Sequence, residues 1–382
     1  MQLPDTGHLL GIVSYRIYPA ENGGQQSITS FYGELSKRVR LSLLVSRDNV
    51  IDPEEPIEIF PQLYSSYRSW MNVFLVYQLI RLIKKRKYTC MLVDHSYYAW
   101  LAWLLRRFTG VPFIIRSHNI ESHRFKDLGR WYWSWIEWYE KRIHQRANYN
   151  WWICREDLKY AIKQWKIDPE KCAVTTYGTL LHSTPEKSQR LASRKKILAT
   201  WQLPESVRLF YFNGSLGYLP NTEALRIIMY DLIPRLRQAA VDFRIIITGS
   251  GMPVEWHSLM SKEKAIILPG FLPDISMYWE GTDCFIHPVT RGAGIKTKLV
   301  EALAHGLPCV TTQAGLRGLD QPGYRKVLLA VPDYDWQAFA EQMVEASDPD
   351  KRYKVPLEFY HQFSLQNIVH SALLSLQQDG NR

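Results

Sequence analysis

The sequence lacks the cysteine pattern of a disulfide-bonded or zinc-binding protein. Only five cysteines occur among 382 residues, at positions 90, 154, 172, 284 and 309, and none forms a Cys-x-x-Cys pair. An odd, scattered set argues against a disulfide framework, and no cysteine–histidine cluster has the spacing of metal ligands. We therefore expect small core thiols in a reducing cytosol.

Long apolar segments are also missing. No window reaches the roughly 18 apolar residues that a membrane span needs. The longest run, residues 97–105, has about half of that length and ends in Arg106 and Arg107. No charged start precedes an apolar segment, so we expect no signal peptide and a cytoplasmic location.

Basic residues, by contrast, are in excess. The formal charge is +10, from 47 Lys and Arg against 37 Asp and Glu. This balance favours anionic partners such as nucleotide diphosphates, anionic lipid headgroups or nucleic acid. No nucleic-acid motif accompanies it, which argues against the last of these. The length and the 46% hydrophobic content predict a globular protein of two similar domains.

The stretch 285–318 combines an apolar run, a glycine-rich turn and a helix. The run ends in His287-Pro288, the turn follows, and a helix is expected from about Thr297 until 306–308 stop it. A second apolar run comes next. In an open parallel sheet, the loop of such a strand–loop–helix unit lies at the carboxyl edge, where ligands bind.

The chemistry of this turn favours a phosphate. Gly292 and Gly294 let backbone N–H groups approach a ligand, and the helix N-terminus adds a positive dipole end. Lys296 and Lys298 put two cations where a helix disfavours them unless an anion is present, and Glu301 can accept from ribose hydroxyls. Alternatively, Lys298 and Glu301 form a solvated pair worth about 0.2–0.5 kcal/mol, and the glycines only turn the chain.

The same alternation of strand, glycine loop and helix recurs along the chain. Three further loops carry it, with Gly23 and Gly24, with Gly214 and Asn221, and with Gly270 and Phe271. Asn221 is expected to cap a helix over 222–238. The first loop has neither the G-x-G-x-x-G spacing of a dinucleotide fold nor a Walker A sequence, so a plain turn stays an alternative. The repetition predicts two doubly wound α/β domains.

Polar residues cluster after the strand expected at 111–115. They include His118 and Glu121, in a segment that follows another polar strand end at 94–96. A lone histidine is often structural, and Glu121 has the alternative of a capping or ion-pair role.

The stretch 125–152 is rich in tryptophan and basic residues. Its tryptophans are Trp131, Trp133, Trp135, Trp138, Trp151 and Trp152. One interpretation is a long helix on a membrane interface, where Trp and Lys/Arg favour the headgroup layer. The other is an amphipathic helix whose aromatic stripe fills a domain core. A surface for single-stranded nucleic acid is a third, less favoured alternative.

The run from Glu301 to Pro308, together with the glycine turn before it, resembles the donor-site motif of family-4-type glycosyltransferases. These are retaining, nucleotide-sugar-dependent enzymes of the GT-B fold. The family usually carries a second glutamate where this chain has Ala293. The resemblance implies two Rossmann-like domains facing an interdomain cleft. We expect an acceptor-side domain at 1–181, a linker at 182–206, a donor domain at 207–360 and a helix at 361–382 that crosses back.

The resemblance also implies roles for individual residues. His118 and the Gly23–Gly24 loop would position the sugar and the acceptor, while Lys296, Lys298 and Glu301 would act on the donor. The residues expected to bind the donor are Gly23, Gly24, Gly214, Asn221, Gly270, Phe271, Arg291, Gly292, Gly294, Ile295, Lys296, Lys298 and Glu301.

The expected function is retaining transfer from a UDP- or GDP-linked sugar to a hydroxyl of a glycan or lipid-linked glycan. No cofactor or metal is expected, because capping and turn chemistry explain the Asp-x-Asp sequences at 333–335 and 348–350. Cell-surface polysaccharide or glycolipid synthesis and a peripheral position at an inner membrane face are further expectations. The alternatives are a non-catalytic nucleotide-sugar-binding subunit, favoured by Ala293, or an epimerase or phosphorylase of the same fold.

Overall fold

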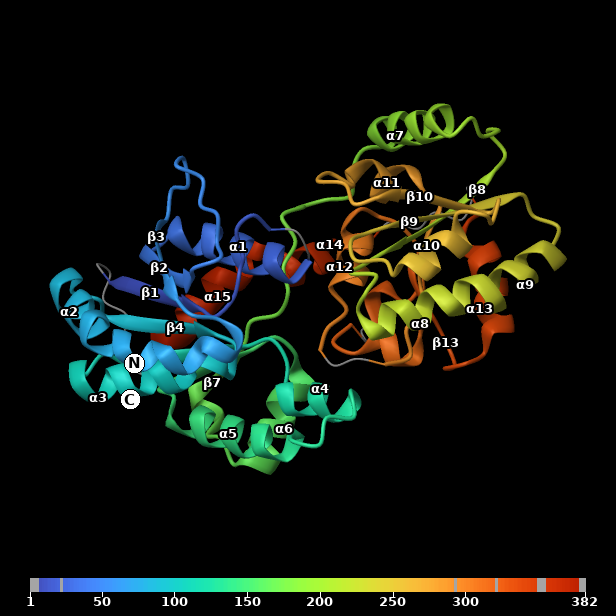
Figure 1. Ribbon diagram of the computed structural model, residues 1–382. Coiled ribbons are helices and arrows are strands. Elements are labelled where there is room, and N and C mark those ends of the chain that lie inside the picture. The colour runs from blue at the N-terminus through green and yellow to red at the C-terminus, as the bar shows by residue number, and fades with distance from the viewer. Residues whose placement is uncertain (1–6, 21–22, 292–293, 320–321, 349–354, 378–382) are drawn as a thin grey trace. The chain divides into compact units, whose positions relative to one another are not determined.

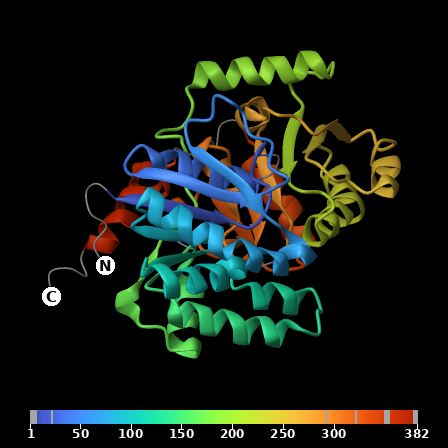
Figure 2. The same cartoon turned by 60° about the vertical axis from the view of Figure 1, so that its left-hand side comes forward.

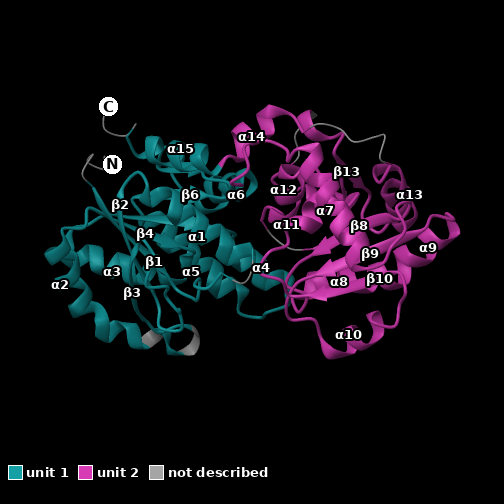
Figure 3. Cartoon of the chain, turned by 90° about the horizontal axis from the view of Figure 1, so that it is seen from above, with its two compact units in different colours: residues 1–178, 365–382 teal, residues 179–364 magenta. Residues whose placement is uncertain are grey.

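The computed structural model describes residues 7–20, 23–291, 294–319, 322–348 and 355–377. The chain forms two compact units, residues 1–178 with 365–382 and residues 179–364 (Figure 3). Each unit contains one all-parallel sheet with helices on both faces, which confirms the predicted pair of Rossmann-like α/β domains.

The first unit is built on a seven-stranded sheet in the order β3-β2-β1-β4-β5-β6-β7. Its strands alternate their side chains between two buried faces, so Leu9 and Val13 of β1 enter one core while Leu10 and Ile12 enter the other. The strands are β1 His8–Val13, β2 Arg40–Ser46, β3 Glu58–Leu63, β4 Cys90–Asp94, β5 Phe113–Ser117, β6 Tyr149–Trp152 and β7 Cys172–Val174.

Helices cover both faces of this sheet (Figures 1 and 2). One core lies under α1 and α15 and the other under α2, α3 and α5. The helices of the first unit are α1 Gly23–Ser36, α2 Val76–Arg86, α3 Ala99–Thr109, α4 Glu121–Asp127, α5 Trp133–Arg146, α6 Arg155–Trp165 and α15 Leu365–Gln377.

The second unit has a six-stranded sheet in the order β10-β9-β8-β11-β12-β13. Its strands are β8 Arg208–Asn213, β9 Phe243–Thr248, β10 Ile266–Gly270, β11 Cys284–His287, β12 Cys309–Thr312 and β13 Leu328–Val331. Its helices are α7 Lys187–Thr200, α8 Leu219–Ile227, α9 Ile233–Gln238, α10 Val254–Met260, α11 Ser276–Gly281, α12 Thr297–Ala304, α13 Trp336–Ala346 and α14 Leu357–Phe363. The predicted start of α12 at Thr297 is confirmed.

The helix predicted over 222–238 is interrupted. A π-helical segment, Ile228–Leu232, separates α8 from α9. Pro234 lacks an N–H and its ring crowds the preceding turn, which explains the local change in hydrogen-bond spacing. The predicted cap is also corrected, because Tyr218 occupies the N-cap position and Asn221 lies inside the first turn of α8.

The segment 182–206, expected as a linker, lies within the second unit. Its helix α7 is held by α11 and the following loop, where Arg194 Nη1 donates to both oxygens of Asp283 at 2.9 and 2.8 Å. Gln189 and Ser193 donate to Glu280, each at 2.6 Å. A Ser-, Lys- and Arg-rich composition suggests a free linker, but here those polar side chains bind carboxylates of the unit.

The tryptophan-rich stretch is not one helix, so the single long helix that the membrane and core interpretations assumed is corrected. It contains part of α4, all of α5 and the strand β6. Trp151 and Trp152 are buried on β6, whereas Trp131, Trp135 and Trp138 are exposed. Among the residues described, no helix has the length and apolar character to cross a membrane.

Candidate active site

The strand order reverses once in each sheet, and the candidate residues lie at those two places or beyond the neighbouring strands. In the first unit, β2 and β4 flank β1, and polar residues follow β1 and β4. In the second unit, β9 and β11 flank β8, and the loops after β8 and β11 carry the glycines and lysines. Ligands of doubly wound sheets bind at such switch points, outside the carboxyl ends of the strands.

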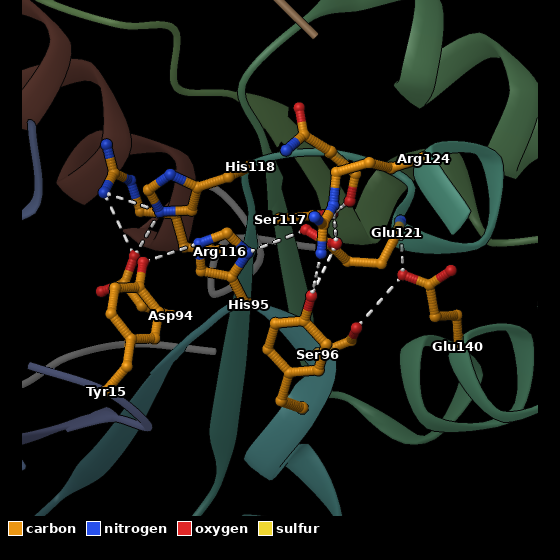
Figure 4. A network of polar contacts seen from close by, with 12 residues as sticks. Tyr15, Asp94, His95, Ser96, Arg116, Ser117, His118, Glu121, Arg124 and Glu140 are labelled. Atoms are coloured by element: carbon orange, nitrogen blue, oxygen red, sulfur yellow. Dashed lines mark hydrogen bonds and ion pairs between the residues drawn. The ribbon is translucent and has the colours of Figure 1, made fainter. Parts of the chain in front are cut away.

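A buried ion pair forms the base of the site in the first unit (Figure 4). Asp94 ends β4 and lies opposite Arg116 of β5 in the parallel register, and their side chains are 0% and 1% exposed. Arg116 Nη1 donates to Asp94 Oδ1 at 3.2 Å, and the guanidinium lies 3.8 Å from the ring centroid of Phe31. Burial alone would raise the pKa of Asp94, but the hydrogen bond from His118 and the charge of Arg116 hold it well below its usual value.

His118 is bound to the same carboxylate. Its Nε2 lies 2.6 Å from Asp94 Oδ1, and since a carboxylate only accepts, Nε2 carries the proton. Burial, then His95 and Arg116, lower the pKa of His118 to about 3, so the imidazole is neutral at neutral pH. Among the described residues no group hydrogen-bonds to Nδ1, and the side chain is 11% exposed. Nδ1 is therefore a lone-pair acceptor at the switch point.

His95 stacks on His118, with ring centroids 4.2 Å apart and planes at 13°. Its Nδ1 donates to Glu121 Oε1 at 3.2 Å, which leaves Nε2 to accept from the Tyr15 hydroxyl at 2.9 Å. The backbone of His95 has φ +60° and ψ 159°, a conformation that costs a residue with a Cβ roughly 1–3 kcal/mol. Such strain at a cluster of titratable side chains is typical of functional sites.

Glu121 closes the outer part of the network. It accepts from the Tyr97 hydroxyl at 2.6 Å and from Arg124 Nε at 2.7 Å. Although burial acts to raise it, the His95 hydrogen bond and the Arg124 charge lower the pKa of Glu121 to about 2. Glu121 is thus a fixed anion that orients His95, not a proton donor.

A second buried carboxylate holds this arrangement from α5. Glu140 accepts the backbone N–H groups of Glu121 at 3.0 Å and Ser122 at 2.8 Å, and the Ser96 hydroxyl at 3.1 Å. It thereby caps α4 from another helix, which satisfies two N–H groups at the helix start. Burial raises the pKa of Glu140 to about 7.

His118 and Glu121, both predicted from the sequence, lie in one network in the structure. Asp94, His95, Arg116 and Glu140 belong to the same network and were not predicted as site residues. The polar end of β4 was a usable signal for the first two, since β4 and β5 are neighbouring parallel strands. Gly23 and Gly24 are the first two residues of α1, at the carboxyl side of β1.

In the second unit, glycines let two loops meet beyond β8 and β9. A Cβ on Gly249, whose φ is +144°, would lie 1.9 Å from the carbonyl oxygen of Gly214. Gly249 N–H also donates to the carbonyl of Gly270, at φ +82°, so the loop after β10 joins the same edge. Asn221 Nδ2 donates to the Ser215 carbonyl at 2.8 Å and thus holds the loop after β8, while Phe271 is exposed beside Gly270.

The loop after β11 places the predicted cations at the start of α12. Lys296 is the N-cap residue, Lys298 is the second helical residue, and Glu301 lies one turn further on. Gly294 has φ +71° and Ile295 is buried, so the turn is anchored to the core. Burial lowers the pKa of Lys298, and the charge of Glu301 opposes that shift.

Two further contacts define this loop. Arg291 Nη1 lies 3.8 Å from Oε1 of Glu223 on α8. This ion pair connects the loop after β11 with the helix that follows β8. Gly292 lies outside the described residues, so its predicted role has no structural counterpart here. The other predicted donor residues of the second unit lie at the carboxyl ends of its strands, in the loops that follow them, or in the first two turns of α8 and α12.

His287 is a candidate site residue that was not predicted from the sequence. It ends β11, is buried, and lies 3.2 Å from the Thr311 hydroxyl on β12. Burial and then the charge of Lys296 lower the pKa of His287 to about 3. Gly315 leaves room for this pair, because a Cβ there would lie 2.0 Å from Thr311 Oγ1.

Chemically, the second unit offers cations and backbone N–H groups suited to an anion, and the first offers a neutral imidazole in a fixed network. Within the described residues, no group of three or more His, Cys, Asp and Glu side chains is placed to hold a metal. Asp335 of the Asp-x-Asp sequence at 333–335 caps α13 by accepting from the Ala338 N–H at 3.0 Å. Residues 349 and 350 of the other sequence lie outside the described part of the chain.

Two family models match the chain. Residues 21–178 match one described as "Glycosyltransferase Family 4", and residues 208–348 match one described as "Glycosyl transferases group 1". Together they span both units. No curated protein sequence matches the chain.

Solved structures share the fold across nearly the whole chain. Sucrose-phosphate synthase from Thermosynechococcus elongatus aligns with a TM-score of 0.72 at 14% identity, covering 97% of this chain and 98% of that one. A glycosyltransferase from Rickettsia africae aligns at 0.70 and 14% identity, covering 98% and 100%. Anabaena HepE in complex with UDP-glucose aligns at 0.73 and 14% identity, covering 97% and 99%.

Proposed function

Because the chain belongs to the family-4, group-1 glycosyltransferases and has their GT-B-type domains, we propose that it transfers a sugar from a nucleoside-diphosphate donor to a hydroxyl acceptor. The observation that carries this proposal is the pair Lys296 and Lys298 at the start of α12, on the switch point of the second sheet. The UDP-glucose bound in the HepE structure supports a nucleotide sugar as the donor class.

On the donor side, the diphosphate would sit at the N-terminus of α12. Lys296, Lys298 and nearby N–H groups neutralise the charge that develops on the leaving diphosphate. This replaces the electrostatic role of a metal, which is why we propose a metal-independent reaction. Glu301 accepts from the ribose hydroxyls, and the loop with Gly270 and Phe271 holds the base of a UDP- or GDP-linked donor.

On the acceptor side, the neutral His118 would orient the sugar and the acceptor hydroxyl. Its proton on Nε2 is held by Asp94, so Nδ1 is the atom that accepts a hydrogen bond. Asp94 and Glu121 are each bound to an arginine and serve structure instead of nucleophilic attack. We therefore propose retention by same-face attack, with the leaving diphosphate taking the acceptor proton.

A thermal-shift series with UDP- and GDP-linked sugars tests donor binding directly. A ligand that binds only the folded protein raises its stability with concentration over Kd, so the true donor gives the largest shift. No shift with any nucleotide sugar at millimolar concentration contradicts the proposal.

Lysine variants then test the site. Lys296→Ala and Lys298→Ala should each raise the donor KM and lower kcat, with a combined cost of about 1.5–3 kcal/mol if they make charged hydrogen bonds. Lys262→Ala, at an exposed position of the same unit, is the matched control. Unchanged kinetics in both site variants would refute their role.

The acceptor we propose is a glycan or lipid-linked glycan, with the enzyme acting in the cytoplasm in cell-surface polysaccharide or glycolipid synthesis. A non-catalytic nucleotide-sugar-binding subunit is the second candidate, because Ala293 stands where the family usually has a glutamate. Slow hydrolysis of a donor that binds in the thermal-shift series separates the two, since a pure binding protein releases no sugar.

A further inference from the structure

Three tryptophans are exposed on one short segment of the first unit. Trp131 lies just before α5, and Trp135 and Trp138 lie one turn apart on its surface. Their side chains are 82%, 68% and 58% exposed. Large aromatic side chains normally bury 150–250 Å² each, so a group of three in solvent indicates a contact surface.

Cations surround these tryptophans. Arg130 and Arg142 are exposed beside them, with the Arg142 guanidinium 5.9 Å from the Trp138 ring centroid, and the Lys126 ammonium lies 4.7 Å from the ring of Trp133. The only exposed carboxylate among residues 126–146 is Asp127. Glu137 accepts from the Tyr160 hydroxyl at 2.5 Å, and Glu140 is buried. The surface is therefore aromatic and positively charged.

The neighbouring helices of the same layer repeat this combination. On α2 and the 3-10 turns before it, Phe74 and Tyr77 are 72% and 67% exposed, and Lys84 and Lys85 are exposed about two turns after Tyr77. Phe108, at the end of α3, is 58% exposed next to Arg107. Since α2, α3 and α5 share one core beneath them, these three helices cover the same face of the sheet (Figure 2).

We propose that the surface formed by Trp131, Trp135, Trp138, Arg130 and Arg142 docks the first unit onto an anionic phospholipid membrane. Tryptophan and arginine together suit the headgroup layer, where the ring is partly buried and the cation meets lipid phosphate. Charge complementarity selects this partner over a neutral glycan or a second copy of this positively charged surface. The docking does not depend on the transfer reaction.

The same helix reaches the candidate site of the first unit. While its outer side carries the tryptophans, its inner side carries Glu140, which caps α4, and Tyr139, whose hydroxyl donates to the Ser96 carbonyl at 2.8 Å. A membrane bound to α5 would thus lie one helix away from the His118 network, which suits an acceptor held in the lipid layer.

Vesicle flotation with the full chain tests the proposal. Vesicles of phosphatidylglycerol and phosphatidylcholine in equal parts should carry the protein, and vesicles of phosphatidylcholine alone should carry far less. The variant W131Q/W135Q/W138Q should bind at least about tenfold more weakly, because it removes apolar area that the headgroup layer would cover. R130Q/R142Q should lose about fivefold in vesicle affinity for each cation removed, at low salt.

Y230S/Y334S is the matched control, because it removes two exposed aromatic side chains from the second unit and should float like the wild type. Melting curves of all variants should coincide, since the changed side chains are exposed. The proposal is overturned if the wild type stays unbound, if the tryptophan variant still floats, or if both vesicle types bind equally. A concentration-dependent dimer that the tryptophan variant abolishes, without vesicle binding, would overturn it in favour of a second copy.

Discussion

Replacing Asp94 with asparagine should destabilise the protein far more than any exposed ion-pair variant. The change keeps the shape of the side chain and removes one charge from a pair whose members are 0% and 1% exposed. Arg116 then remains a buried cation without its counter-charge. Breaking a buried pair from one side costs about 3–5 kcal/mol, and the amide oxygen that asparagine keeps as an acceptor places the expected loss near the lower end, at about 3 kcal/mol.

The assay is urea unfolding followed by far-UV circular dichroism, with the free energy obtained by linear extrapolation. Asp242→Asn is the control, because Asp242 and Arg244 also form a pair at 3.0 Å but are 53% and 28% exposed. That pair should contribute less than about 1 kcal/mol, since solvent screens it.

A double-mutant cycle separates the interaction energy of the ion pair from the effect of changing the shape of each side chain. Arg116→Met alone leaves Asp94 buried without its guanidinium, and D94N/R116M leaves neither charge. The double variant should recover about 2 kcal/mol or more relative to the sum of the single losses, because no uncompensated charge is left. The reasoning is refuted if Asp94→Asn costs less than about 1 kcal/mol, or if the two single losses simply add.

Three further predictions concern stability. His95→Gly should be more stable than His95→Ala by about 1 kcal/mol in urea unfolding, because only glycine adopts φ +60° without strain; equal stabilities would contradict the strain. Gly249→Ala should lower the stability clearly more than Gly270→Ala, because only the Cβ at position 249 would meet a carbonyl oxygen. Gly270→Ala should cost about 1–2 kcal/mol, which comes from the positive φ alone. Melting temperatures in the reverse order would count against this. Glu140→Gln should change how the free energy of unfolding depends on pH. The pKa of Glu140 in the folded protein, about 7, exceeds the ordinary value of 4.5, so the folded state holds an extra proton between these pH values. The free energy of unfolding of the wild type therefore falls by about 3 kcal/mol as the pH rises through this range. The glutamine variant lacks this fall while sharing the opposite contribution of the buried histidines, so a constant difference between the two proteins at pH 5 and pH 8 would disprove it.

The alternation of strands, glycine loops and helices was predictable because it depends on local signals. Apolar runs of strand length, glycines after them and helical spacing act over a few residues. The start of α12 at Thr297 and the lysines beside it follow from such signals. The polar composition of 182–206 led to the prediction of a linker because composition shows only that a segment is hydrophilic. The residues that bind α7, Glu280 and Asp283, lie about 90 residues further along the chain.

The network around His118 was only half predictable. Its members come from the ends of two strands and two helices, and the pairing of Asp94 with Arg116 depends on the register between β4 and β5. Register is a property of the assembled sheet, and no short-range pattern encodes it. The role of Glu140 could not be predicted for a related reason. A carboxylate in the middle of a helix is normally interpreted as solvent-exposed, and only the folded structure places two backbone N–H groups against it.

The two candidate clusters differ in how their charged side chains are arranged. In the first unit, Asp94 faces Arg116 and Glu121 faces Arg124, so the charges cancel inside the network and the exposed chemistry belongs to a neutral imidazole. In the second unit, Lys296 and Lys298 stand at the positive end of α12, where the charge of Lys296 lowers the pKa of His287 and the charge of Glu301 opposes the burial shift of Lys298. We therefore expect the diphosphate of the proposed donor to bind at the second cluster. This difference between the clusters agrees with the proposed reaction, in which one domain stabilises a departing anion and the other orients a neutral hydroxyl.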